Sequence, residues 1–429
     1  MEMKIVLLNG NSDAGNRTWN GYLTQIEGQL AAQGHSVENC TLRDMDLRSC
    51  IGCFGCWVKT PGECITPDDG ALVRDAMIHA DVVLCAAPMR MGYPDALLKR
   101  MMDKSIPLIH PYFEVVNGEA HHRGRYKHYP RLGLLLEREV DTDERDVRIV
   151  TDMFRRTALN LKTRLQFALL SDAPAGEVVK AIANGKPALK GLPAAPAPTQ
   201  GVRVTPPLRL TVFNGSPRGH KSNTRTMAEQ LLSGFSGLGE GRTFEILDLN
   251  RTKEAERFPR AFGEAECVLL GFPLYTDAMP GIVKAFIEQL EPFCGRAGNP
   301  PIGFMVQSGF PEAAHSRYVE RYLEKLAERL GSPYLGTIVK GGAEGIRIMP
   351  DRMTHGLFES LRALGRTLGT TGAFDPLLLR QVAGRERYPF YMGPVFQLLS
   401  RTSLLSSYWD SQMKKNGVFA RSHARPYER

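Results

Sequence analysis

Short apolar runs alternate with amphipathic stretches along most of the chain. Residues 4–10 and 208–213 are strand-like, and each leads through a polar turn into a helical pattern. Residues 80–88 and 265–273 read as buried strands that end at a proline and precede another helix. Strands alternating with helices predict a parallel sheet covered on both faces, with ligands bound at the carboxyl ends of the strands.

These segments occur twice and predict an internal duplication. Residues 4–10 align with 209–215, and residues 80–88 align with 265–273. The second alignment continues through Lys99 with Lys284 and through Asp103 with Glu288. The first copy is longer before Pro88, and the run from Cys50 to Asp69 has no counterpart in the second copy. We therefore expect two α/β domains, each a doubly wound parallel sheet, with a cysteine-rich insertion in the first.

The expected domain boundaries follow from this duplication. Residues 1–187 form the first domain, residues 188–207 a Pro/Ala-rich linker and residues 208–350 the second domain. Residues 351–429 are expected to form a mostly helical, basic C-terminal extension. Its aromatic residues favour packing on a domain surface over disorder.

Composition narrows the class of protein. The chain has 429 residues, 43% of them hydrophobic, and a net charge of +8. We find no signal peptide and no apolar stretch approaching the ~20 residues of a membrane helix. A cytoplasmic protein without a membrane span is expected, and no motif indicates a nucleic-acid partner. Cysteines stay reduced in that compartment, so the eight cysteines are better read as ligands, redox groups or core residues than as disulfides.

The segment from Phe213 to Thr224 predicts a phosphate site. It joins a strand to a helix through a turn rich in Gly, Ser, Asn and Thr, where backbone N–H groups and the helix dipole favour an anion. Hydroxyls of Ser216, Ser222 and Thr224 and the charges of Arg218 and Lys221 could complete the site. Its spacing is neither that of a P-loop nor that of a dinucleotide fingerprint. The alternative is an ordinary polar loop.

The second copy resembles the flavodoxin-like NAD(P)H-dependent FMN reductases. The resemblance rests on residues 215–218 (GSPR), residues 222–224 (SNT), residues 273–275 (PLY) and Pro280, and it covers 208–345 well and 4–110 more loosely. It implies that the first loop holds the FMN phosphate, and that a second loop and the loop 307–310 lie along the flavin ring. Tyr275 is the expected ring contact, and no residue is named as catalytic because the flavin carries the chemistry. The cofactor-binding residues implied in this copy are Ser216, Arg218, Ser222, Asn223, Thr224, Pro273, Leu274, Tyr275, Thr276, Ser308 and Gly309.

The first copy departs from this pattern. Asp13 stands where the family has a basic residue, and at the offset of the first strand Arg17 takes the place of Ser222. Its second loop is closer to the family, and the ring contacts implied there are Pro88, Met89, Arg90, Met91 and Gly92. The first copy could be a working flavin site, a degenerate one or a platform for the other copy. We expect the second copy to be the principal flavin site.

The first copy also resembles iron–sulfur flavoproteins, which carry a compact cysteine motif at this place in the fold. Cys50, Cys53, Cys56 and Cys64 can ligate one [4Fe–4S] cluster. A zinc site, a redox dithiol and a metal-free packed turn are the alternatives. A second group of polar residues, the histidines between His110 and His128, is expected to form a polar lid or a surface loop, with metal binding as a further option.

The resemblance implies an FMN-dependent NAD(P)H oxidoreductase that passes electrons to a quinone-like or other small acceptor. The expected partners are that small molecule and a second subunit, or else the two copies pair with each other. One alternative is an iron–sulfur flavoprotein electron carrier whose basic tail docks a redox protein. Another is a binding module that kept the fold and lost the cofactor.

Overall fold

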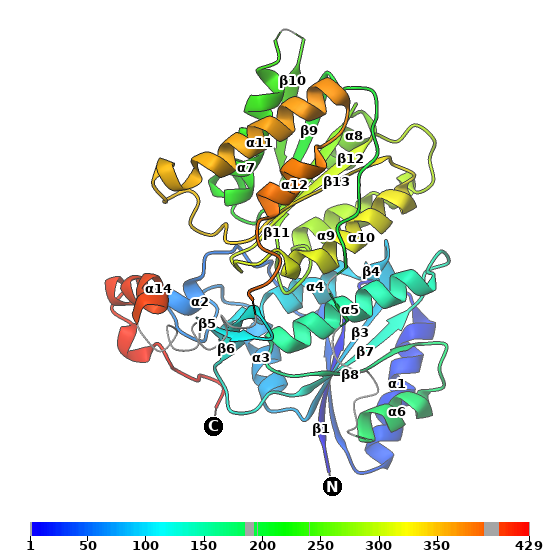
Figure 1. Ribbon diagram of the computed structural model, residues 1–429. Coiled ribbons are helices and arrows are strands. Elements are labelled where there is room, and N and C mark those ends of the chain that lie inside the picture. Colours follow the sequence, from blue (N-terminus) through cyan, green and yellow to red (C-terminus); the bar gives the residue numbers. More distant parts are fainter. Residues whose placement is uncertain (1, 185–192, 195, 240, 390–402, 429) are drawn as a thin grey trace. The chain divides into compact units, whose positions relative to one another are not determined.

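The chain folds as two compact units in a computed structural model that describes residues 2–184, 193–194, 196–239, 241–389 and 403–428 (Figure 1). The first unit comprises residues 1–117, 121–193 and 391–429. The second comprises residues 118–120 and 194–390. The expected linker at 188–207 lies partly outside the described residues.

The first unit is built on a parallel sheet in the order β2-β1-β3-β7-β8. Its strands are β1 (Lys4–Asn9), β2 (Ser36–Thr41), β3 (Val82–Arg90), β7 (Arg131–Glu137) and β8 (Leu165–Leu170), and the short β4 (Tyr93–Pro94) pairs antiparallel with β3. The central strands are almost wholly apolar because helices cover both faces. This strand order is that of flavodoxin-like folds.

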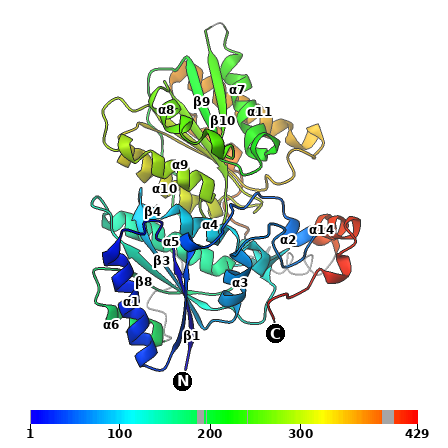
Figure 2. The ribbon, with the colours of Figure 1, turned by 180° about the vertical axis from the view of Figure 1, so that it is seen from behind.

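Helices of the first unit lie on both faces of this sheet (Figure 2). The helices α1 (Arg17–Ala32) and α6 (Ala175–Ala183) pack together against one face and share its core with residues such as Trp19 and Ile182. The helices α3 (Gly70–Ile78), α4 (Ala96–Asp103) and α5 (Glu144–Asn160) lie on the other face.

The second unit repeats this plan with the order β10-β9-β11-β12-β13. Its strands are β9 (Arg209–Asn214), β10 (Thr243–Asp248), β11 (Val268–Pro273), β12 (Ile302–Gln307) and β13 (Tyr334–Lys340). One face carries α7 (Asn223–Ser236), α11 (Asp351–Thr371) and α12 (Pro376–Ala383), and the other carries α8 (Arg257–Gly263), α9 (Gly281–Gln289) and α10 (Ala314–Leu330). The prediction of two flavodoxin-like parallel-sheet domains is confirmed.

Local details also repeat between the copies. A β-bulge lies between Leu132 and Gly133 in β7, and another lies between Ile302 and Gly303 in β12. Each copy buries a lysine in the helix after the proline-terminated strand and pairs it with an acid one turn later. These ion pairs are Lys99 with Asp103 and Lys284 with Glu288.

Two additions distinguish the first copy. The expected cysteine-rich insertion lies between β2 and α3 and contains the single-turn helix α2 (Gly55–Val58). A two-stranded sheet of β5 (Ile109–Val116) and β6 (Glu119–Gly124) follows α4, and the sequence analysis did not foresee it. The remaining short elements are the 3₁₀ helices η1 (Leu42–Asp44), η2 (Ile106–Leu108), η3 (Gly219–Lys221), η4 (Thr252–Glu254), η5 (Glu291–Phe293) and η6 (Phe419–Arg421).

The C-terminal region is helical but does not form one extension. Helices α11 and α12 belong to the second unit, where Leu361, Leu364 and Leu368 enter the core over α7. Residues 391–429, with α14 (Ser403–Lys415), belong to the first unit. This corrects the single boundary at 351, because tertiary packing rather than local composition divides the region. Among the described residues, no helix is long and apolar enough to cross a membrane.

Candidate functional site

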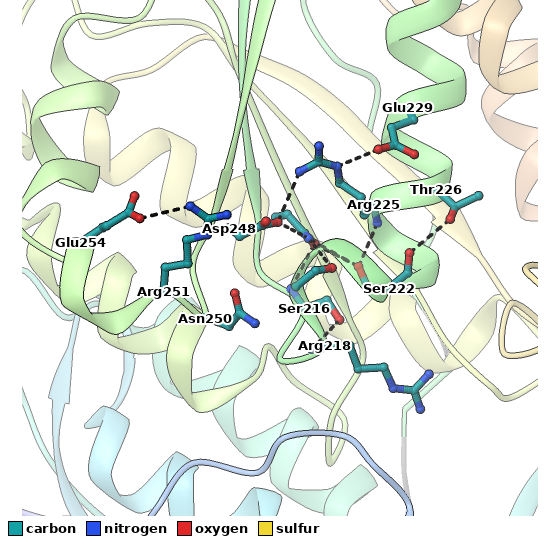
Figure 3. Close-up of polar contacts among 12 residues, drawn as sticks. Ser216, Arg218, Ser222, Arg225, Thr226, Glu229, Asp248, Asn250, Arg251 and Glu254 are labelled. Carbon is teal, nitrogen blue, oxygen red and sulfur yellow. Dashed lines mark hydrogen bonds and ion pairs between the residues drawn. The ribbon is translucent and has the colours of Figure 1, made fainter.

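The loop between β9 and α7 is shaped by Asn214. Its Nδ2 donates hydrogen bonds to the carbonyl oxygen of Gly219 at 2.9 Å and to Oδ1 of Asp248 at 2.7 Å. Its Oδ1 accepts from the backbone N–H of Ser216 at 3.2 Å. Figure 3 shows Ser216 and Ser222 close together on this turn, beside Asp248. The loop therefore has a defined shape before any ligand binds.

Ser222 begins the helix that follows. Its Oγ accepts a hydrogen bond from the backbone N–H of Arg225 at 3.1 Å, as an N-cap residue does. The N–H groups of Asn223 and Thr224 lie in the first turn of α7, so no carbonyl oxygen of the helix accepts from them. They form part of the positive end of the helix dipole. Ser216 and these three residues are each at most 3% exposed. The geometry is that of an anion site at a helix N-terminus.

A carboxylate that the sequence analysis missed lies at this loop. Oε1 of Glu344 forms an ion pair with Nη1 of Arg218 at 2.9 Å, and its carbonyl oxygen accepts from Nδ2 of Asn223 at 3.0 Å. Arg347 donates to the carbonyl oxygen of Lys221. The segment after β13 therefore contacts the predicted phosphate loop. No motif pointed to Glu344, because its partner lies more than a hundred residues earlier in the chain.

The second predicted loop follows Pro273 at the end of β11. Tyr275 and Ala278 exchange two backbone hydrogen bonds of 2.9 Å, and Thr276 and Asp277 adopt left-handed conformations with φ of 40° and 59°. The N–H of Leu274 donates to the carbonyl oxygen of Gln307 at 2.7 Å, which ties this loop to the end of β12.

The third loop follows directly after β12. The N–H of Ser308 donates to the carbonyl oxygen of Lys340 at 2.9 Å, and its Oγ donates to that of Phe310 at 3.1 Å. The Phe310 ring stacks on buried His315 with centroids 4.0 Å apart. All three predicted segments of the second copy, Gly309 included, thus lie at the carboxyl ends of the adjacent strands β9, β11 and β12. Their contacts with a flavin stay a prediction.

The first copy forms the same loops with one change of register. Oδ1 of Asn16 accepts from the backbone N–H of Trp19 at 3.0 Å and caps α1. Asn16, not Arg17, therefore takes the structural place of Ser222. The alignment used for the sequence prediction was wrong at this point, because the first-copy loop is one residue shorter.

The second loop of the first copy, Pro88 to Gly92, also keeps the backbone of its counterpart. Met89 and Arg90 pair with the two residues of β4, and Met91 and Gly92 are left-handed with φ of 53° and 73°. These angles match those of Thr276 and Asp277. The two copies therefore share a turn that places two successive N–H groups at the strand end.

The four cysteines of the insertion influence one another electrostatically. The pKa of the Cys50 thiol is raised to about 12, mainly by burial, with smaller contributions from Asp103, Cys64 and Cys53. Burial raises the pKa of Cys56 well above its usual range, with smaller contributions from the other three thiols. The backbone N–H of Gly55 donates to Sγ of Cys53 at 3.3 Å. Hydrogen bonds to sulfur and a set of four thiols in one loop suit a soft metal centre.

These thiols do not form a closed metal site as they stand. Among the described residues, no group of three or more His, Cys, Asp or Glu side chains is arranged to hold a metal ion. The ligands of a [4Fe–4S] cluster each bind a different iron, so they lie further apart than ligands that share one ion. The donor set therefore fits a cluster in chemistry, and binding would deprotonate the thiols.

Aromatic side chains pack around the cysteine loop. Phe54 and Trp57 stack with centroids 5.0 Å apart, and Trp409 of α14 meets both rings edge-on at 5.3 and 5.2 Å. The Trp57 indole donates from Nε1 to the carbonyl oxygen of Ile109 at 3.0 Å. The C-terminal segment therefore covers part of this loop, while Cys53 stays exposed.

The end of the chain is held by buried arginines. Nη1 of Arg125 donates to the carbonyl oxygen of Ala424 at 2.8 Å, and Nε of Arg74 donates to the hydroxyl of Tyr427 at 3.0 Å. Both arginines are 1% exposed. Such contacts fix residues 422–428 beside β5 and α3 within the first unit.

Of the predicted lid histidines, His110 lies on β5 and His121 and His122 lie on β6, whereas His128 follows β6 outside any strand. Burial lowers the pKa values of His110 and His122 to about 3, with Arg125 and Lys162 respectively adding repulsion. His121 is buried, whereas His128 is exposed. His110 packs against His423 of the C-terminal segment, whereas His121 hydrogen-bonds to Asn160 of α5.

Comparison with known proteins gives a family match in each copy. Residues 3–121 match the family model described as NADPH-dependent FMN reductase, and residues 209–356 match that described as flavodoxin-like fold. An iron-sulfur flavoprotein of Methanocaldococcus jannaschii is 33% identical over 107 residues, which are 25% of this chain and 53% of that protein. An iron-sulfur flavoprotein of Archaeoglobus fulgidus is 28% identical over 103 residues, or 24% and 49% of the two chains. The chain spans about half the length of these curated relatives.

Solved structures are similar to parts of the chain at low identity. A putative quinone reductase from Klebsiella pneumoniae is 13% identical, with coverage of 44% of this chain and 99% of that chain and a TM-score of 0.32. The family matches fall on both copies that the sequence and the two sheets define. The chain therefore has two flavodoxin-like domains in tandem, the first of which matches the NADPH-dependent FMN reductase model over residues 3–121 and the second the flavodoxin-like fold model over residues 209–356.

Proposed function

We propose that the chain is an NAD(P)H-dependent flavin oxidoreductase that holds the FMN phosphate on the loop between β9 and α7. The observation that carries the proposal is the N-terminus of α7. Its first-turn N–H groups lie beside the buried hydroxyls of Ser216 and Thr224, on a loop that Asn214 has already shaped. These groups fit a phosphate because they offer donors, and the nearby carboxylates of Asp248 and Glu344 are each paired with an arginine.

Bound FMN would supply the electron transfer from NAD(P)H to the acceptor. The chain's own residues would place and cover the ring. Tyr275 would contact the ring from the turn after β11, and Ser308 and Gly309 would contact it from the turn after β12. The left-handed pair Thr276 and Asp277 sets the direction of the first turn.

A quinone-like or other small molecule is the acceptor that we propose. A flat acceptor could stack on the ring face that Tyr275 does not cover. NAD(P)H would bind in the same position first and leave before the acceptor enters. Such a site needs shape and polarity from the protein and no nucleophile or general base.

The test compares FMN with riboflavin, which has the same ring and no phosphate. Deflavinated full-length protein should bind FMN at least about tenfold more tightly than riboflavin. Arg218→Glu should weaken FMN and leave riboflavin nearly unchanged, because only the phosphate meets the reversed charge. Arg251→Glu is a matched control, since Arg251 is exposed beyond β10 and pairs with Glu254. Equal affinities for the two flavins in wild-type protein would contradict the phosphate assignment.

A second candidate function is an electron carrier in which Cys50, Cys53, Cys56 and Cys64 hold a [4Fe–4S] cluster. The observation that favours it is the set of four free thiols in one insertion, one of which accepts a hydrogen bond from a backbone N–H. Exposed lysines and arginines of the C-terminal segment would dock an acidic redox protein. A cluster would give about four irons per chain in anaerobically purified protein. Cys53→Ser should abolish the iron, and Cys294→Ser, which changes a cysteine of the second copy, should retain it.

A further inference from the structure

We infer that the first copy has lost the flavin phosphate site because carboxylates of the chain itself bind the backbone groups that a phosphate would need. The family match over residues 3–121 makes FMN the expected ligand of this copy. The donors around residues 10–18 do not fit it. This inference rests on the proposed function of the second copy, which supplies the reference geometry.

Asp13 is a residue of the loop itself and binds one of the loop's own N–H groups. Its Oδ1 accepts a hydrogen bond from the backbone N–H of Gly15 at 2.7 Å. Asp13 is the fourth residue after Asn9, as Arg218 is the fourth after Asn214, and both asparagines accept from the N–H two residues later. A carboxylate therefore replaces the guanidinium of the second copy and binds a loop N–H itself.

Asp95 binds the same loop from the next strand end. Its Oδ2 accepts from both the hydroxyl and the backbone N–H of Ser12, the latter at 3.4 Å. Its Oδ1 accepts from Leu97 at 2.8 Å and caps α4, and Asp95 is 2% exposed. In the second copy the residue before the corresponding helix α9 is Pro280. The first copy thus has a buried carboxylate where the second has an uncharged ring.

Glu137 brings a third carboxylate. Pro88 lies opposite Glu137 across β3 and β7. In the second copy Pro273 lies opposite Gln307 across β11 and β12, so Glu137 stands in the place of Gln307. Oε2 of Glu137 accepts from Nδ2 of Asn16, the cap of α1, at 2.7 Å. The side chain at the helix cap is therefore held by an acid.

Glu139 likewise binds backbone N–H groups of the second loop, Pro88 to Gly92. Its two carboxylate oxygens accept from the backbone N–H groups of Met91 at 2.6 Å and Gly92 at 2.9 Å. The corresponding residue after β12 is Gly309, two residues beyond Gln307. These N–H groups lie on the turn that would run along a flavin ring. Glu139 therefore occupies the two backbone donors that a ring would meet there.

The second copy has two acids at its loop, and each is paired with an arginine, Glu344 with Arg218 and Asp248 with Arg225. Asp248 accepts from Asn214 and lies 3.5 Å from Nη1 of Arg225. Across the matched positions the first copy therefore carries Asp13, Asp95 and Glu137 where the second carries an arginine, a proline and a glutamine. A phosphate dianion entering the first copy would meet three carboxylates and would have to displace two of them from backbone donors.

Hydrogen exchange of the full-length protein tests this directly. Adding FMN to deflavinated protein should slow amide exchange within residues 215–224 and leave residues 10–18 unchanged. Slower exchange in residues 10–18 would overturn the inference. If FMN protects neither segment, the proposed function fails while the closure of the first copy stands. Without FMN, Glu139→Ala should speed exchange at Met91 and Gly92, and unchanged exchange there would also overturn the inference.

A matched charge swap provides the second test. FMN titration of deflavinated protein should give one site per chain, and Arg218→Asp should weaken that site by about tenfold or more. Asp13→Ala should leave the affinity of that site unchanged. Two tight sites per chain in wild-type protein would overturn the inference and leave the proposed function standing. A single site weakened by Arg17→Glu and untouched by Arg218→Asp would overturn both.

Discussion

Nη1 of Arg218 lies 2.9 Å from Oε1 of Glu344, so a basic side chain that the phosphate-loop motif supplies already has a carboxylate partner. Both side chains are partly exposed, at 26% and 30%. An ion pair of this kind contributes little to stability, about 0–1 kcal/mol, so its partners can exchange without large cost. Glu344 therefore competes with an anionic ligand for Arg218 and orients the guanidinium meanwhile.

Removing this competitor should tighten FMN binding. Glu344→Gln keeps the side-chain shape and leaves the guanidinium free for the phosphate, and we expect affinity to rise by up to about fivefold. Glu359→Gln is the control, because Glu359 pairs with Arg362 on α11. Isothermal titration of deflavinated protein measures both. Weaker binding in Glu344→Gln would show that the pair positions Arg218 more than it competes.

The fold was predictable because its signals are local and occur twice. The alignment of Lys99 with Lys284 and of Asp103 with Glu288 indicated equivalent helices, and the structure places a buried lysine–acid ion pair in each. The apolar runs of β3 and β11 likewise predicted buried strands, because a strand that is covered on both faces is apolar at nearly every position.

Features that depend on contacts between distant residues were not predictable. The single-residue difference between the two phosphate loops appears only when Asn16 and Ser222 are seen to cap equivalent helices. Glu344 and Asp95 reach their loops from other strand ends, and no periodicity reports such contacts. The return of residues 403–428 to the first unit depends on buried Arg74 and Arg125, which read as ordinary surface charges in the sequence.

Close packing of α7 on α11 should support the phosphate loop. A Cβ added at Gly365 would lie 1.9 Å from the carbonyl oxygen of Leu231, so the helices must separate to admit it. Gly365→Ala should destabilise the second unit by about 1–3 kcal/mol, as overpacking does, and weaken FMN because α7 carries the loop. Denaturant unfolding and FMN titration measure the two effects.

The same helix offers a matched control. Gly356 is an exposed residue of α11, and a Cβ there would have no atom within 4 Å. Gly356→Ala should therefore stabilise the protein by about 0.5–1 kcal/mol through helix propensity, with FMN affinity unchanged. Equal effects from the two substitutions would contradict a specific contact at Gly365.

The C-terminal segment should protect the cysteine loop. Trp409→Ala removes an edge contact with both Phe54 and Trp57, and we expect a loss of about 1–3 kcal/mol in the first unit. Cys56 should then react faster with iodoacetamide, whereas exposed Cys53 should react at its former rate. Lys415→Ala, on the same helix, is the control, since Lys415 is exposed. Mass spectrometry of the labelled cysteines separates the sites, and unchanged labelling of Cys56 would show that the segment does not shield it.

Acid should destabilise the first unit through buried His110 and half-buried His122. The pKa values of His110 and His122 fall from 6.5 to about 3 because burial disfavours the charged ring. The unfolded chain therefore binds protons at these residues below pH 6.5 while the folded chain does not. Their contribution to stability is present above pH 6.5 and is lost as the pH falls towards 3, at up to about 1.4 kcal/mol per pH unit for each histidine.

Replacing one histidine should flatten this dependence. His122→Gln keeps a polar side chain that cannot gain a proton, so the fall in unfolding free energy between pH 6.5 and 5 should shrink by about 1–2 kcal/mol. His128→Gln should leave the slope unchanged, because His128 is exposed. Urea unfolding followed by tryptophan fluorescence reports on the first unit, since Trp19, Trp57 and Trp409 all lie there. Identical slopes in wild type and His122→Gln would mean that the ring takes up its proton without unfolding, and would contradict the burial argument for this residue.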